Sequence, residues 1–197
     1  MRANPKRPAP PDDFHVAGKE ELWEFLFSNV DVDPQGGAFR VSQQRLLILR
    51  PEALVDLQKH LEGTIGLSSK GFLYLAGERS AREGHDLFAS LAPSGADARD
   101  PLDVLRERVA AMALLGWGRL EVAAEEPSAH RFLVSLDDSP LAEAYGNSKK
   151  PVCHLLAGWI AGTAQAVLGE SLLCEEIACR AQGKARCEFR LRPTPYG

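Results

Sequence analysis

Apolar residues recur every three or four positions in several stretches of the chain, which is the spacing of one helix face. One such helix is predicted to open at Pro51, because proline suits the first helical position. A second is predicted from Asp100 as N-cap and Pro101 as first residue, with Gly116 ending it near Leu115. The apolar stripe of the first helix consists of Leu54, Leu57, Leu61 and Ile65. Further helices are predicted over 19–29, 140–145 and 151–168.

In the last third of the chain, apolar and polar residues instead alternate, the period of a strand with one buried face. Residues 117–122 and 131–136 predict a hairpin with its turn at 126–128. The alternation over 187–192 predicts one strand of a second hairpin, turning at Gly183, and both hairpins should share a sheet. Two shorter strands are predicted over 39–41 and 45–49, after a turn at Gly36-Gly37.

The stretch 67–91 fits neither period well, because Gly71, Gly77 and Gly84 interrupt an otherwise strand-like apolar run. The elements together predict an α+β fold, with an antiparallel sheet of hairpins packed against a layer of helices. A chain of 197 residues fits one domain of ordinary size. The predicted boundaries are a proline-rich disordered arm at 1–13, a single domain at 14–192 and a tail at 193–197.

The net charge of −4 gives no basic footprint, which argues against direct nucleic-acid binding. No apolar run reaches the length of a membrane span, and the charged, proline-rich N-terminus lacks a signal-peptide core. These features, together with clustered thiols that suit a reducing compartment, predict a cytoplasmic protein.

All four cysteines lie between Cys153 and Cys187. Cys153 falls near the start of a predicted helix, where the helix dipole favours the thiolate that a metal needs. Cys179 is predicted to lie across the hairpin from Cys187, with Cβ atoms about 5 Å apart. Three thiols and a carboxylate are a suitable ligand set for zinc, which usually takes four N, S or O ligands.

The fourth ligand stays open on spacing alone. Strict alternation puts Glu175 on the face of Cys179, so Glu176 reaches the metal only if a bulge or bend lies between them. Cys174 is a further competitor. Ordinary buried thiols, or a disulfide between Cys179 and Cys187, are the alternatives to a metal site.

Two motifs carry a resemblance to a known family. They are Tyr145-Gly-Asn-Ser-Lys-Lys-Pro-Val-Cys-His-Leu-Leu-Ala-Gly-Trp-Ile-Ala-Gly and Glu176-x-x-Cys179-x-x-x-Gly183-x-x-x-Cys187-x-Phe189. The chain resembles the 4-vinyl-reductase domain family, which is related to the sensor domains of phenol- and xylene-responsive activators and to TRAPP subunits. The resemblance is most specific over 116–192, and it favours helix over 67–91. It implies that the zinc ligands are Cys153, Glu176, Cys179 and Cys187.

A zinc ion with four protein ligands has no open position for water, so the implied site is structural rather than catalytic. The sequence carries no Walker loop, dinucleotide fingerprint or G-x-S-x-G elbow, so nothing in it indicates an enzyme. The resemblance implies an apolar ligand cavity between the helices and the sheet, a small apolar or aromatic ligand, and a homodimer. The candidate pocket residues are Tyr74, Met112, Trp117, Phe132 and Trp159.

The leading hypothesis is therefore a stand-alone sensor or regulatory domain that passes its signal to a separate partner protein. Phenol itself is a doubtful ligand, because the chain has no clear counterpart of the histidine with which the phenol sensors hold the hydroxyl. The resemblance also implies two alternatives: a tetrapyrrole carrier or accessory protein in (bacterio)chlorophyll 8-vinyl reduction, and a TRAPP-like dimeric scaffold.

Overall fold

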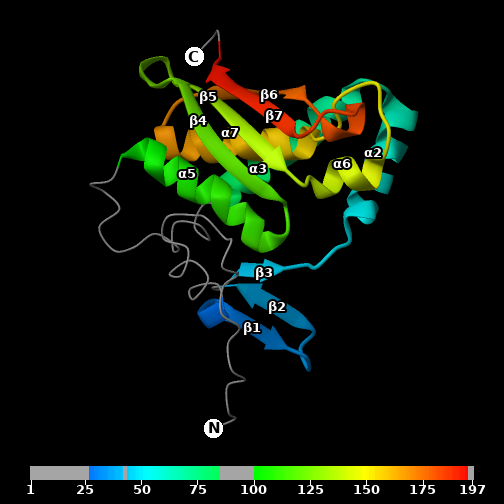
Figure 1. The fold of residues 1–197 in the computed structure, drawn as a ribbon. Coiled ribbons are helices and arrows are strands. Elements are labelled where there is room, and N and C mark those ends of the chain that lie inside the picture. Colours follow the sequence, from blue (N-terminus) through cyan, green and yellow to red (C-terminus); the bar gives the residue numbers. More distant parts are fainter. Residues whose placement is uncertain (1–26, 42–43, 85–99, 195–197) are drawn as a thin grey trace.

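The computed structural model describes residues 27–41, 44–84 and 100–194. Its larger sheet is antiparallel, with the strand order β4-β5-β7-β6, so the two predicted hairpins share one sheet. In Figure 1 the helices α5, α7 and α3 lie beneath this sheet, and a smaller sheet lies below them. The strands of the larger sheet are β4 (Arg119–Glu126), β5 (Arg131–Asp137), β6 (Leu172–Ala178) and β7 (Cys187–Pro193).

The helices agree with most of the predicted ranges. Asp100 caps α5 by accepting a 2.9 Å hydrogen bond from the backbone N–H of Leu102, as its place before Pro101 predicted. The α-helices are α2 (Pro51–Ile65), α3 (Ser68–Glu83), α5 (Pro101–Ala111), α6 (Pro140–Tyr145) and α7 (His154–Leu168). The 3-10 turns are η2 (Met112–Leu115), η3 (Pro127–Ala129) and η4 (Arg180–Gln182).

The larger sheet buries one face, and the alternation in its sequence decides which one. Phe132, Val134 and Leu136 of β5 point into the core, together with Phe189 and Leu191 of β7. On the other face charged residues form cross-strand ion pairs, such as Arg190 with Glu125 at 3.4 Å. The predicted α+β architecture, with an antiparallel sheet of hairpins against a helical layer in a single domain, is confirmed.

The helices α3 and α7 cross at backbone contact. A Cβ atom built on Gly158 would lie 1.9 Å from the carbonyl oxygen of Tyr74, and one on Gly77 would lie 1.9 Å from that of Leu155. Gly162 of α7 meets the carbonyl oxygen of Glu78 in the same way, at 2.4 Å. The small residues of α7 therefore serve tight internal packing, as predicted, and they draw α3 under the centre of the fold.

A second, smaller sheet consists of β1 (Val30–Asp33), β2 (Ala38–Val41) and β3 (Gln44–Leu46). The predicted turn at Gly36-Gly37 joins β1 to β2. The strand β1 was not predicted, although its sequence Val-Asp-Val-Asp alternates. The strand predicted over 45–49 is shorter than expected, since residues 47–49 leave the sheet and run toward α2.

Two details of the helix predictions are wrong. The stripe of α2 does not face the core: Val55 and Gln58 are buried, whereas Leu57 is 55% exposed. Gln58 is buried because its amide donates to the carbonyl oxygen of Val152 at 3.1 Å. The last long helix begins at His154 rather than Pro151, which makes Cys153 its N-cap.

Several predictions fall largely outside the described residues, namely the arm at 1–13, most of the helix at 19–29, the loop at 92–99 and the end of the tail. Of the stretch 67–91, the helix favoured by the resemblance is present from Ser68 to Glu83. Within the described ranges, no helix is both long enough and apolar enough to cross a bilayer.

Candidate metal centre and apolar cavity

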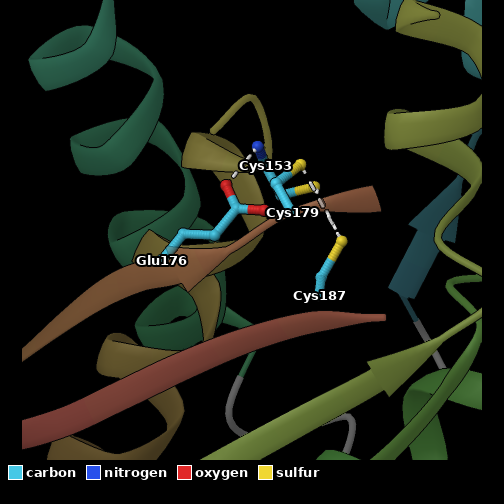
Figure 2. Close-up of side chains that lie close together, drawn as sticks. All are labelled: Cys153, Glu176, Cys179 and Cys187. Atoms are coloured by element: carbon cyan, nitrogen blue, oxygen red, sulfur yellow. Dashed lines mark hydrogen bonds between the residues drawn. The ribbon is translucent and has the colours of Figure 1, made fainter. Parts of the chain in front are cut away.

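The last hairpin and the start of α7 meet at a cluster of three thiols and a carboxylate (Figure 2). One ligand atom from each of Cys153, Glu176, Cys179 and Cys187 lies within 4.8 Å of every other. The Sγ atom of Cys187 lies 3.9 Å from that of Cys153 and 3.9 Å from that of Cys179. The three cysteines are 0% exposed and Glu176 is 8% exposed, so the cluster is closed to solvent.

A β-bulge brings Glu176 to the thiols. The pairing of β6 with β7 shifts register between Glu176 and Ala178, at the place where alternation alone required an irregularity. Glu176 therefore shares the buried face with Cys179. The competing residues lie elsewhere: Glu175 is exposed and 4.0 Å from Arg192, and the backbone N–H of Cys174 donates to the Tyr74 hydroxyl. All four cysteines are free thiols, so the structure contains no Cys179–Cys187 disulfide.

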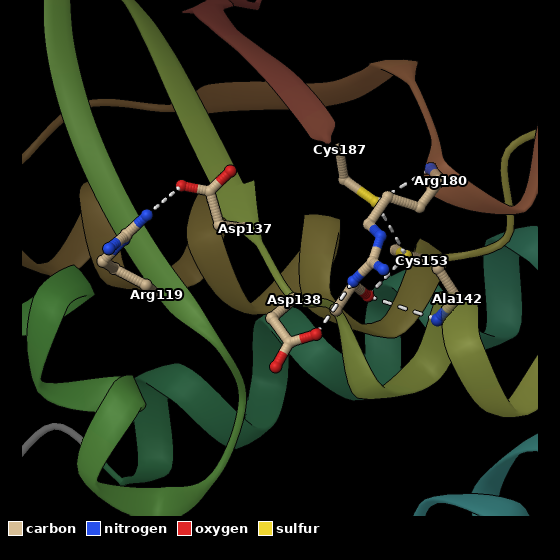
Figure 3. A network of polar contacts seen from close by, with 8 residues as sticks. Arg119, Asp137, Asp138, Ala142, Cys153, Arg180 and Cys187 are labelled. Atoms are coloured by element: carbon tan, nitrogen blue, oxygen red, sulfur yellow. Dashed lines mark hydrogen bonds and ion pairs between the residues drawn. The ribbon is translucent and has the colours of Figure 1, made fainter. Parts of the chain in front are cut away.

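Neighbouring backbone and side chains orient the cluster (Figure 3). The backbone N–H of Arg180 donates to Cys187 Sγ at 3.3 Å, and the Arg180 side chain pairs with Asp138 at 2.9 Å. Ser139 Oγ lies 3.5 Å from Cys153 Sγ and also accepts from the backbone N–H of Ala142. These contacts fix the sulfur positions, as the hydrogen bonds around metal ligands commonly do.

The cluster has the chemistry of a cation site. Glu176 Oε2 accepts from the backbone N–H of Cys153 at 2.8 Å, but Glu176 Oε1 is buried and lacks a hydrogen-bond partner among the described residues. A buried carboxylate oxygen without a partner is costly unless a cation fills the gap. The donor set of three sulfurs and one oxygen fits the residues that hold zinc in structural sites.

The titration of these groups supports the same conclusion. Hydrogen bonds from Cys153 and Cys179 lower the pKa of Cys187 to about 4, whereas burial raises the pKa of Glu176 to about 8. Hydrogen bonding to Cys179 and Cys187 raises the pKa of Cys153 well above its ordinary value. Without a cation the cluster thus favours few negative charges. A bound metal ion would be needed to hold all of the ligands deprotonated.

The predicted pocket residues do not all meet. An apolar cavity of about 800 Å³ lies between the small sheet, α3, η2 and α7, and Trp117 and Trp159 line it. An adjoining cavity of about 730 Å³ also has Trp117, Trp159 and Met112 in its wall. Phe132 lines neither cavity, because it is 2% exposed in the sheet core. Tyr74 lines neither, since its hydroxyl points to Cys174 of β6.

Sequence reasoning missed much of the wall of the larger cavity. The small sheet supplies Phe39 and Val41, and the segment after β3 supplies Leu47, Ile48 and Leu49. The last three residues are 78%, 81% and 58% exposed, which is unusual for consecutive large apolar residues. The run Leu46-Leu-Ile-Leu was the available signal, because a continuous apolar run beyond a short strand has no place in a solvent-exposed loop.

The fold and the thiol cluster together define an α+β domain of the sensor type. The family model of the 4-vinyl-reductase domain matches residues 132–193, and the resemblance to that family is confirmed over this segment. The chain is 24% identical over 184 residues to the phenol regulator MopR of Acinetobacter guillouiae. That alignment covers 85% of this chain and 31% of MopR, so the chain spans about a third of the length of this relative.

Two solved structures share the fold. The phenol-responsive sensory domain of the transcription activator PoxR, solved with phenol, has a TM-score of 0.75 at 20% identity. The match covers 91% of each chain. Trafficking protein particle complex subunit 3 of Naegleria fowleri, covalently bound to palmitic acid, has a TM-score of 0.55 at 20% identity. This second match covers 74% of this chain and 96% of the subunit.

Proposed function

We propose that this protein is a small-molecule sensor module, in which an apolar cavity takes the ligand and a zinc ion fixes the adjoining hairpin. The observation that carries the proposal is the cavity of about 800 Å³ lined by Trp117 and Trp159. Its size and apolar wall suit a small aromatic or aliphatic ligand. The names of the relatives support this reading, since MopR is a phenol regulator and PoxR has a phenol-responsive sensory domain.

Zinc is the metal we propose for Cys153, Glu176, Cys179 and Cys187, because thiolate-rich sites of four protein ligands suit it. The ion would fasten the N-cap of α7 to the β6–β7 hairpin. Since α7 also carries Trp159 into the cavity wall, the metal would hold one side of the ligand site in place. The module would act in the cytoplasm and signal through a separate partner protein.

Filling the cavity from α3 is expected to abolish ligand binding without disturbing the core. Ser80 is an exposed residue of α3 that lines both cavities, so Ser80→Leu places an isobutyl group where the ligand would lie. We expect the affinity for phenol, xylene or a medium-chain fatty acid to fall about tenfold or more, because apolar contact is worth about 0.8 kcal/mol per methylene. Tryptophan fluorescence and thermal-shift titration measure this change.

Ser68→Leu is the matched control, because Ser68 is exposed on the same helix and lines neither cavity. Equal ligand affinity in the Ser80 and Ser68 variants would place the ligand elsewhere. If none of these apolar compounds raises the melting temperature of the wild-type protein, the sensor proposal fails.

A dimeric scaffold is the second candidate function, and exposed apolar residues on α3 favour it. Phe72 is 63% exposed and Leu75 is 60% exposed, one turn apart on the outer face of α3. Such a stripe is typical of a protein-binding surface. We propose that a second copy of the chain covers it.

Replacing Phe72 with aspartate is therefore expected to convert a homodimer into a monomer at micromolar concentration, because a charge would be buried without a partner. Light scattering coupled to gel filtration measures the mass. Val32→Asp is the control, since Val32 is 60% exposed on β1 of the small sheet. A wild-type protein that is already monomeric would contradict the scaffold.

A further inference from the structure

A polar cleft separate from the apolar cavities lies beside the start of α7. It has a volume of about 340 Å³ and is enclosed by the turn between α2 and α3 and by residues 145–154. Lys70, Lys149 and Lys150 line it, together with Ser69 and Ser148. We call this feature the lysine cleft. It shares no lining residue with either apolar cavity, so it is a second candidate site.

The lysine cleft concentrates positive charge in a protein whose net charge is −4. Within the described residues, none of the three lysine side chains forms an ion pair with a carboxylate. The acidic residue in the wall is Glu62, and both of its oxygens are engaged. Glu62 Oε2 accepts from the Tyr145 hydroxyl at 2.6 Å, and Oε1 accepts from Gln58 Nε2 at 2.9 Å. The lysine charges are therefore left for a ligand.

The backbone that carries Lys149 and Lys150 is held in place. Ser148 Oγ donates to the carbonyl oxygen of Lys150 at 2.7 Å and accepts from its N–H at 3.1 Å. The carbonyl oxygen of Lys149 accepts from Gln182 Nε2 at 3.2 Å, and the N–H of Ser148 donates to the carbonyl oxygen of Ala181 at 2.8 Å. Both lysines thus project from a segment fixed to the η4 turn, which lowers the entropy lost on binding an anion.

The wall also includes His154, the first residue of α7, a helix of fifteen residues. The positive end of its dipole faces this end of the helix, which favours a negative group nearby. Lysines act on phosphates as strong point charges, and several of them around one small space match a doubly charged group. We propose that the lysine cleft binds the phosphate group of a soluble small molecule.

Calorimetric titration of the whole chain with pyrophosphate and with glycerol 3-phosphate at low ionic strength tests this proposal. We expect one saturable site whose affinity falls as salt is added. The double substitution Lys149→Ala and Lys150→Ala should weaken binding about tenfold or more, because each removes a charged contact to the phosphate. Both lysines are exposed, so the variant should fold normally.

Lys184→Ala is the matched control, since Lys184 is an exposed lysine that follows the η4 turn but does not line the cleft. Its phosphate affinity should equal that of the wild type. Absence of saturable binding at millimolar phosphate, or equal affinity in the double variant, would overturn the proposal. Binding to vesicles that contain phosphatidic acid, without binding to either soluble phosphate, would overturn the assignment to a soluble ligand. Apolar ligands remain a separate assay, so the sensor proposal stands or falls independently.

Discussion

Replacing Cys179 with serine is expected to remove the metal and to lower the free energy of unfolding by about 4 kcal/mol or more. Cys179 is fully buried, and its Sγ lies 3.9 Å from that of Cys187. A serine hydroxyl is a poor zinc ligand, and loss of the ion would leave Glu176 and two thiols crowded together without a cation. For a chain of this length the melting temperature should fall by about 10 °C or more.

Metal content per chain after purification without chelator, together with thermal melts before and after chelation, measures this effect. The wild type should carry one zinc ion and lose stability when chelated, whereas the variant should be insensitive to chelator. A variant that retains its metal and melts normally would show that Cys179 is not a ligand.

Cys174→Ser provides the matched control. Cys174 is 3% exposed on the same strand as Glu176, yet it lies outside the thiol cluster. The same chemical change there should cost only about 1–3 kcal/mol for a buried hydroxyl and leave the metal content unchanged. Loss of zinc from this variant would mean that the ligand set is wrong.

The bulge in β6 explains why spacing alone could not choose the carboxylate. Period-2 alternation assigns Glu175 to the face of Cys179, and a register shift between Glu176 and Ala178 reverses that assignment. A bulge has no distinctive composition, so the pattern could state that one was required but not that it was present. The family motif supplied the choice of Glu176.

Hydrophobic patterns also predicted elements better than they predicted faces. The helix α2 was predicted from the stripe that includes Leu54, Leu57 and Leu61, but its buried positions are Val55 and Gln58. A buried glutamine with a hydrogen-bond partner is invisible to a pattern based on hydrophobicity. For the same reason the pattern could not separate Trp159, which lines the cavity, from Phe132, which fills the sheet core.

Substituting Gly158 with alanine is expected to destabilise the protein by about 3 kcal/mol, although alanine is the better helix former. The added methyl group would lie 1.9 Å from the Tyr74 carbonyl oxygen and 2.7 Å from its carbonyl carbon. These are backbone atoms, so relief requires that α3 move as a whole. The overpacking cost exceeds the gain in helix propensity of about 1 kcal/mol. Thermal and urea unfolding measure the difference.

Gly71→Ala separates the packing effect from helix propensity. Gly71 lies in α3 and is exposed, and a Cβ built on it meets nothing within 4 Å. That substitution should stabilise the protein by about 0.5–1 kcal/mol, the opposite sign. Displacement of α3 in the Gly158 variant should also weaken apolar ligands, because Gly77 and Ser80 of α3 line the larger cavity. If both alanine variants were stabilised alike, the two helices would not cross at backbone contact, and the cavity wall would need another support.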